Sequence, residues 1–208
     1  MVLISMNHDT WELIVCWQSS ATNSVEILAP NIVTRDDTLK FTRVTTQSVL
    51  GAIAYFAGGI LVDHGWIRVL GSSHQKINRS LDSWNKAVDS EGYLLFADDI
   101  VGGFFAINGG KLPGAVGSVH YFAPDTYQWE DLGQKHSDII LWLFNGDLDQ
   151  FYEKFRWNNW QKEVEAISSD RAYHFYPFPV TKEFDIQTAS RKAISLKELW
   201  DFETTFLD

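Results

Sequence analysis

Cysteine is almost absent from this 208-residue chain, and basic residues are scarce compared with acidic ones. The single cysteine, Cys16, excludes an intrachain disulfide and a cysteine-based zinc cluster. No hydrophobic run approaches the roughly 18 to 20 residues that a membrane-spanning helix needs. Residues 1–6 lack the basic region of a secretory signal peptide. We therefore expect a cytoplasmic protein whose fold depends on burial and backbone hydrogen bonds.

The charge balance narrows the class of partner. With 17 basic and 27 acidic residues, the formal net charge is −10. A negative field of this size disfavours nucleic acid and anionic membranes as partners and favours a basic protein. The alternative is that the acidity serves solubility alone. The sequence does not set the oligomeric state.

Motifs for catalysis and metal binding are also missing. The six histidines never fall at the i, i+2 or i, i+4 spacing of metal ligands, and no Gly-x-Ser-x-Gly elbow occurs. The glycine pairs lack the remaining residues of a phosphate-binding loop. We predict no metal, no cofactor and no catalytic residue. Whether the chain is an enzyme stays open, with a non-enzymatic role preferred.

The chain is rich in aromatic residues instead. It has nine tryptophans, and 45% of its residues are hydrophobic, which is typical of a globular protein. The aromatic side chains are expected either to fill the core or to lie partly exposed at a binding surface. A length of 208 residues suits one large domain, or a domain with an appendage.

The first helix is expected to begin at Asp9, where an acidic residue precedes apolar residues at helical spacing. Cys16 falls next to Trp17 on the apolar side of this helix. It is therefore expected to be a buried, unreactive thiol.

Short apolar runs separated by turn residues indicate strands through the next part of the chain. Residues 49–56 and 60–62 are interpreted as a hairpin that turns at Gly58 and Gly59, with a bulge or second turn at residues 63–65. Further strands are expected at 25–28, 66–70, 93–97, 103–107, 118–122 and 127–129. The pattern predicts an antiparallel meander of about five or six strands.

Helical spacing replaces the strand pattern after residue 136. Ser137 is expected to cap a helix over 138–144, a second helix starts at Asp147, and a third covers residues around 160–167. Ser195 begins a capping box for a last short helix. The predicted class is thus α+β, with helices packed on a meander sheet. The predicted division is a single domain over residues 1–178 and a C-terminal extension with a short helix over 179–208.

Polar residues at strand ends are the candidate binding residues, since rigid scaffolds display functional groups there. A hairpin end and its exit loop could bring Asp63 and His64 close to His74, although a plain turn explains them as well. Asp98 and Asp99 could act as paired carboxylates, or simply form the turn between two strands. The full set of candidates is Asp63, His64, Trp66, His74, Asp98, Asp99 and Trp129.

Six segments carry a family resemblance, and they begin at Val44, Gly59, Leu70, Phe96, Gly102 and Tyr121. Together they resemble one bacterial family, the group classified as domain of unknown function 2625. The resemblance covers the chain from the first helix to about residue 178, and it implies no activity, since that family has no established function. A weaker similarity of pattern extends to the SUKH superfamily, which implies a SUKH-like fold and, for many members, a role as an immunity protein against a secreted toxin.

Two functional hypotheses follow. The first is a non-enzymatic protein-binding module that captures a basic, toxin-like partner through an acidic and aromatic-rich surface. The alternative is a small-ligand-binding protein or enzyme with a polar site around Asp63, His64 and His74.

Overall fold

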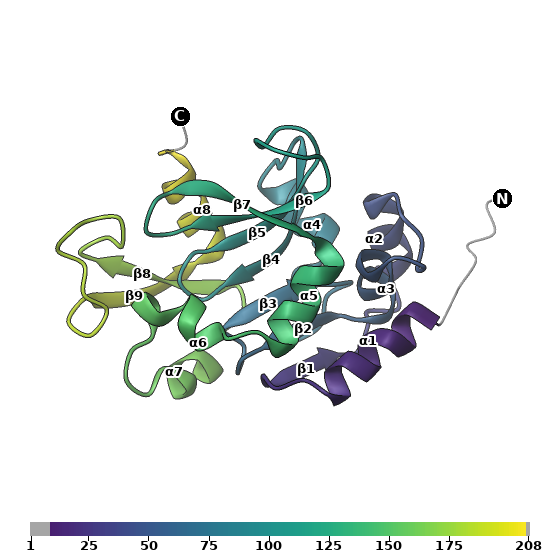
Figure 1. Ribbon diagram of the computed structural model, residues 1–208, viewed down its shortest axis with the longest axis horizontal. Coiled ribbons are helices and arrows are strands. Elements are labelled where there is room, and N and C mark those ends of the chain that lie inside the picture. The colour runs from purple at the N-terminus through teal and green to yellow at the C-terminus, as the bar shows by residue number, and fades with distance from the viewer. Residues whose placement is uncertain (1–8, 207–208) are drawn as a thin grey trace.

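The computed structural model describes residues 9–206, which form a central sheet, a separate hairpin and the helices that cover them (Figure 1). The sheet contains β1 (Val25–Leu28), β2 (Gly59–Val62), β3 (Ile67–Leu70), β4 (Tyr93–Asp99), β5 (Phe104–Asn108), β6 (Ser118–Ala123) and β7 (Gln128–Lys135). The hairpin consists of β8 (Arg171–Tyr176) and β9 (Ser190–Ser195). The helices are α1 (Asp9–Ser19), α2 (Arg35–Thr42), α3 (Val49–Phe56), α4 (Leu81–Ala87), α5 (His136–Asn145), α6 (Leu148–Phe151), the 3-10 helix η1 (Glu153–Phe155), α7 (Trp160–Ala166) and α8 (Leu196–Thr204).

The sheet is an antiparallel meander in which every strand lies beside its neighbour in sequence, in the order β1 to β7. This confirms the predicted α+β class with helices packed on a meander. The sheet has seven strands, which is somewhat more than the sequence predicted. Its register places one residue from each strand in a single row on one face: Glu26, Leu61, Arg68, Asp98, Phe104, Phe122 and Trp129.

Helices cover both faces of the sheet. Trp84 of α4 and Trp200 of α8 both pack on Phe104, on the face that carries this row. Tyr121 follows the opposite face, because successive residues of a strand alternate, and it packs on Phe151 of α6. None of the helices in residues 9–206 is long and apolar enough to cross a bilayer.

The C-terminal segment folds back onto the sheet. β9 pairs along its whole length with β8, and α8 starts where the Ser195 hydroxyl accepts a hydrogen bond from the Glu198 amide at 3.1 Å. This is the short helix expected from the capping box. Trp200 lies 4% exposed and packs on both Phe104 and Trp129. The last described helix therefore belongs to the layer that covers the sheet.

The prediction of a strand over 49–56 is wrong, because these residues form α3. The Ser48 hydroxyl caps this helix by accepting from the Gly51 amide at 3.1 Å. Most of α3 is buried, so nearly all of its residues are apolar. Such a run has no pattern of apolar and polar residues by which a helix could be told from a strand. The predicted hairpin turn at Gly58 and Gly59 is wrong for the same reason, and the hairpin instead turns at residues 63–66.

Two smaller expectations about helices are also corrected. Cys16 is exposed, since α1 buries Ile14 and turns Cys16 away from the core. Ser137 does not cap α5, which starts one residue earlier, at His136. There the Lys135 amide donates to the Asp138 carboxylate at 3.3 Å.

Candidate functional site

The turn between β2 and β3 holds two of the candidate residues. Asp63 and His64 both adopt left-handed backbone angles, with φ of 53° and 59°. Such angles are uncommon outside glycine, and Asp and His are among the residues that tolerate them. The Asp63 amide donates to the Ser24 carbonyl at 2.7 Å, which fixes the turn against β1. The Nδ1 atom of His64 lies 3.0 Å from Glu165 on α7.

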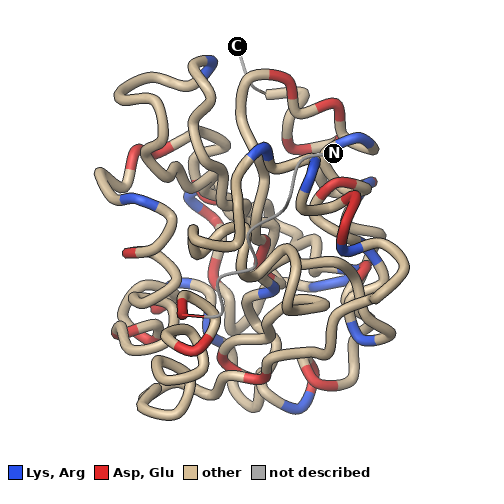
Figure 2. The backbone as a smooth tube through the Cα atoms, turned by 90° about the vertical axis from the view of Figure 1, so that its right-hand side faces the viewer, with Lys and Arg blue, Asp and Glu red and all other residues tan. Residues whose placement is uncertain are grey.

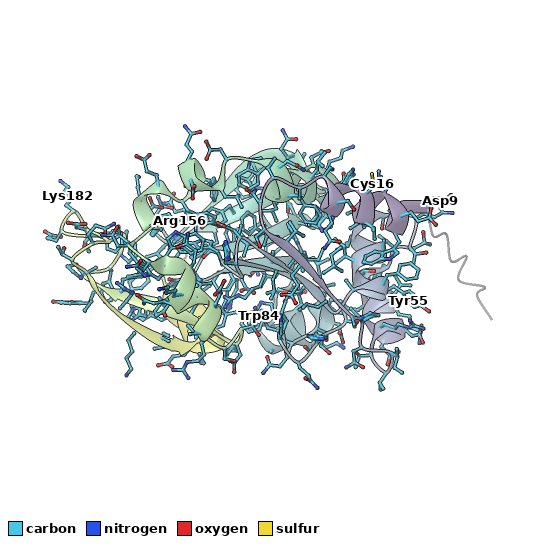
Figure 3. The ribbon with its side chains drawn as sticks, turned by 90° about the horizontal axis from the view of Figure 1, so that it is seen from below. Asp9, Cys16, Tyr55, Trp84, Arg156 and Lys182 are labelled. Atoms are coloured by element: carbon cyan, nitrogen blue, oxygen red, sulfur yellow. The ribbon has the colours of Figure 1, made fainter. Side chains whose placement is uncertain are left out.

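A cage of aromatic rings beside this turn holds the guanidinium of Arg156. The central carbon of that group lies 3.8 Å from the ring centroids of both Trp66 and Trp160, whose ring planes are inclined at 79° to each other. Arg156 is labelled in Figure 3. Its Nη2 atom donates to the Asp63 carboxylate. Burial is the main influence on that carboxyl and raises its pKa, while the charge of Arg156 opposes the shift. Arg156 is therefore an internal partner of both Asp63 and Trp66, and these contacts hold the segment after α6 against the sheet.

His64 borders a cleft of about 470 Å³ between the first three strands and α7. Two exposed ion pairs, His64–Glu165 and Lys76–Glu26, stand at its sides. Pairs this exposed contribute only about 0–1 kcal/mol each and open easily. The cleft is lined by Ser24, Glu26, Leu61, His64, Gly65, Arg68, Gln75, Lys76, Val164, Glu165, Ile167, Ser168 and Ser169.

His74 lies away from this turn. It follows β3, whereas His64 precedes that strand, so the two imidazoles belong to opposite ends of it. The Nδ1 atom of His74 accepts from the Lys76 amide at 3.1 Å, and its backbone pairs with Ile77. Within residues 9–206, no group of three or more His, Cys, Asp or Glu side chains could hold a metal ion.

Asp98 lies inside the sheet between two arginines. It was interpreted as part of a turn, but β4 continues through it to Asp99. Asp98 is fully buried, and its carboxylate accepts from the Arg68 Nε atom at 2.6 Å and from Arg79 Nη2. Arg68 also donates to the carbonyl of Arg171 at 2.6 Å, which ties β8 to the sheet. Asp98 therefore supplies the counter-charge for two buried cations.

Asp99 points to the opposite face and has no cationic partner. Its Oδ1 atom accepts from the amides of Val101 and Gly103 at 3.0 and 2.7 Å. Its Oδ2 atom accepts from the hydroxyls of Tyr121 and Tyr152 at 2.7 and 3.1 Å. Burial raises the pKa of this carboxyl, and the four donors oppose the shift. Asp98 and Asp99 thus face different layers and do not form a carboxylate pair.

Glu203 of α8 is a second buried carboxyl near this region. It is 3% exposed and lies against Gly102, and its Oε2 atom has no hydrogen-bond partner. Burial, with a smaller contribution from Asp99, raises its pKa well above the usual value. The proton therefore binds more tightly to Glu203 in the folded state than in the unfolded state.

This shift predicts a loss of stability with rising pH. The protonated form of Glu203 favours the folded state. This contribution to stability is complete at pH values below the unfolded pKa of about 4.3, and it is lost as the pH rises through the folded pKa. Each unit between the two values costs about 1.4 kcal/mol. Glu203→Gln, which stays neutral, should therefore melt at a higher temperature than the wild type above about pH 6, with a difference that shrinks towards pH 4. Equal pH profiles of the two proteins by thermal melting would contradict this account.

Trp129 lies on β7, far from the turn at residues 63–65, at the other side of the sheet. It is half-buried and packs on Phe122, Tyr93 and Trp200. Trp129 therefore packs between the sheet and α8, and only part of its side chain is exposed to solvent.

The surface that begins at β7 is strongly acidic. Residues 129–153, which run through β7, α5 and α6, contain six acidic side chains and one lysine, a net charge of −5 out of −10 for the whole chain. The six are Glu130, Asp131, Asp138, Asp147, Asp149 and Glu153. On the side of the molecule that Figure 2 shows, which is the right-hand side in Figure 1, Lys and Arg are interspersed with Asp and Glu. We call the first region the acidic segment.

An apolar pocket of about 360 Å³ lies inside the acidic segment, between β7, α5 and α6. Its apolar lining comes from Leu132, Ile139, Trp142 and Phe151, and Asp138 borders it. Apolar centres with a polar rim are typical of protein–protein interfaces. The net charge of the whole chain does not locate this region, whereas counting charge in windows of about 25 residues does.

Comparison with known proteins gives a family but no activity. The family model described as protein of unknown function DUF2625 matches residues 1–199, which is further than the resemblance to residue 178 drawn from the motifs. The uncharacterised protein YbfG of Escherichia coli (strain K12) is 40% identical over 203 residues, 97% of this chain and 93% of YbfG. An uncharacterised protein of Haemophilus influenzae is 34% identical over 181 residues, 84% of this chain and 79% of that protein. No solved structure matches the chain.

Proposed function

We propose that this chain, which belongs to the DUF2625 family of proteins of unknown function, is a non-enzymatic protein-binding module that captures a basic protein. The observation that carries the proposal is the acidic segment, which holds half of the net charge and whose residues also line an apolar pocket. Complementary charge speeds the encounter with a partner and selects against partners of the wrong sign. The pocket offers a place for an apolar anchor from that partner.

The finer form of the proposal is an immunity protein that neutralises a secreted toxin. Toxins that act on nucleic acid need basic surfaces to bind phosphates, and such a surface complements the acidic segment. The internal use of Asp98 and Asp99 supports a binding role over catalysis, since both carboxylates already have a full set of protein partners.

The alternative is a small-ligand-binding protein or enzyme that uses the cleft beside His64. The observation in its favour is the cleft itself, where the ion pairs of His64 and Lys76 could open to meet a charged ligand. Asp63 would then contribute indirectly, by holding Arg156 against the turn. His74 takes no part in the lining of this cleft.

Affinity purification of the tagged protein from its own host tests the proposed function. We expect a basic protein to be retained at about 0.1 M salt and released by about 1 M, because the Debye length falls from about 10 Å to about 3 Å over this range. Mass spectrometry of the eluted fractions identifies the partner. Retention of no basic protein, or release that does not depend on salt, would contradict the proposal and leave the cleft beside His64 as the better candidate.

A further inference from the structure

β7 is an edge strand of the sheet, and most of its residues are exposed. This eight-residue strand pairs with β6 on one side, and no described strand pairs with its other side. Alternate amide and carbonyl groups along such an edge have no partner in the sheet and can pair with another chain. The opposite edge, β1, has four residues, and the side chain of Gln18 already donates to the Val25 carbonyl there at 3.2 Å. β7 is thus the longer of the two edges, and the amides of Gln128, Gly133 and Lys135 already donate to the side chains of Thr126, Asp131 and Asp138.

The apolar pocket adjoins this edge. Leu132 and Gln134 of β7 form one side of it, and Trp142 of α5 forms another. A strand that paired with β7 would direct alternate side chains to the face covered by α5, where one large apolar side chain could enter the pocket. The backbone edge would supply hydrogen bonds, and the pocket would supply selectivity.

The charges along β7 determine which kind of segment could pair with this edge. Glu130 and Asp131 are exposed, Asp138 follows at the start of α5, and Lys135 is the single cation of the acidic segment. Antiparallel pairing of two copies of β7 would bring the Glu130–Asp131 pair of each copy close to that of the other, and like charges across strands are destabilising. A second copy is therefore a poor occupant. A segment rich in lysine or arginine is a good one.

We infer that the open edge of β7 binds an extended basic segment of a partner protein, which adds to the sheet as its next strand and places an apolar side chain in the pocket of Leu132, Ile139, Trp142 and Phe151. This inference rests on the proposed protein-binding function and names its surface and its mode. Gly133 has a left-handed φ of 64°, and the pairing with β6 shifts register nearby. The regular part of the edge is therefore Gln128–Asp131, next to the most acidic residues.

A synthetic peptide tests this mode without knowledge of the natural partner. The probe is a labelled eight-residue peptide that alternates lysine with valine and carries one tryptophan, and the control has glutamate in place of each lysine. We expect fluorescence anisotropy to show binding of the basic peptide, at least about tenfold tighter than the control. Hydrogen exchange of the amides in residues 128–135 should slow when the basic peptide binds.

A matched pair of variants locates the binding. Glu130→Lys with Asp138→Asn changes the charge of the edge by +3 and keeps a capping residue at 138. Glu91→Lys with Glu183→Gln changes the total charge equally at exposed sites outside the acidic segment. We expect the first variant to bind the basic peptide at least about fivefold more weakly and the second to bind it like the wild type.

Three results would overturn the inference: no binding of the basic peptide, equal loss in both variants, or unchanged exchange in residues 128–135. These results are distinct from failure of the proposed function. A basic natural partner that binds equally to both variants would overturn strand addition at β7 and leave protein binding intact. If the peptide bound at β7 but the affinity purification retained no basic protein, β7 would remain a peptide-binding edge and the proposed function would be contradicted.

Discussion

Replacing Asp98 with asparagine should lower the free energy of unfolding by about 3–5 kcal/mol, because removing one member of a buried ion network leaves uncompensated charge. Asp98 is fully buried and is the carboxylate shared by Arg68 and Arg79. Asparagine has the same shape but no charge, so two cations would remain in the core without a counter-ion. Urea titration followed by tryptophan fluorescence measures the loss.

An exposed ion pair provides the control. Asp201 pairs with Lys197 on the surface of α8, with both side chains largely in solvent. Asp201→Asn should change stability by less than about 1 kcal/mol, since exposed pairs contribute little. A loss for Asp98→Asn as small as that for Asp201→Asn would show that the buried network does not hold the sheet and β8 together.

Gly103→Ala should cost a comparable amount, about 3 kcal/mol or more, because a methyl group forced into a packed core displaces its neighbours. A Cβ atom at Gly103 would overlap the Oδ2 atom of Asp99 and the hydroxyl of Tyr121. The two groups would have to separate, and a buried carboxylate would then lack donors that it now has. The expected result is a lower melting temperature, measured by circular dichroism.

Gly117→Ala separates this effect from the general cost of replacing glycine. Gly117 has a left-handed φ of 88°, and a Cβ atom there would meet no atom within 4 Å. Its replacement should cost only about 1 kcal/mol, from backbone strain alone. If Gly103→Ala proved no more harmful than Gly117→Ala, the close contact between Gly103 and Asp99 would not matter for the fold.

Local patterns predicted most of the meander because each strand pairs with its sequence neighbour. Phe104–Asn108 and Ser118–Ala123 were found within one residue at each end, since glycine and proline turns bound them. The helix after Ser195 was found from its cap. The helix at Val49–Phe56 was missed because a short buried apolar run carries no period, so packing alone decides between helix and strand.

The internal charge network could not be predicted from spacing. Arg68 and Asp98 are thirty positions apart and meet only because β3 and β4 pair in one register. Arg156 reaches the Asp63 turn across a larger separation still. Charged residues are rarely buried unless paired, so each alone indicated a surface position. The acidic segment differs, because its charge is local in sequence and a count over short windows reveals it.

If the acidic segment captures a basic partner, as we propose, changing its charge should release that partner. Quantitative affinity purification at about 0.1 M salt, with three baits, tests it most directly. The baits are the wild type, the Glu130→Lys, Asp138→Asn variant and the Glu91→Lys, Glu183→Gln variant. The account predicts that the wild type and the last variant retain the same basic protein, and that the variant at β7 and α5 loses most of it. Equal retention by all three baits would contradict the claim.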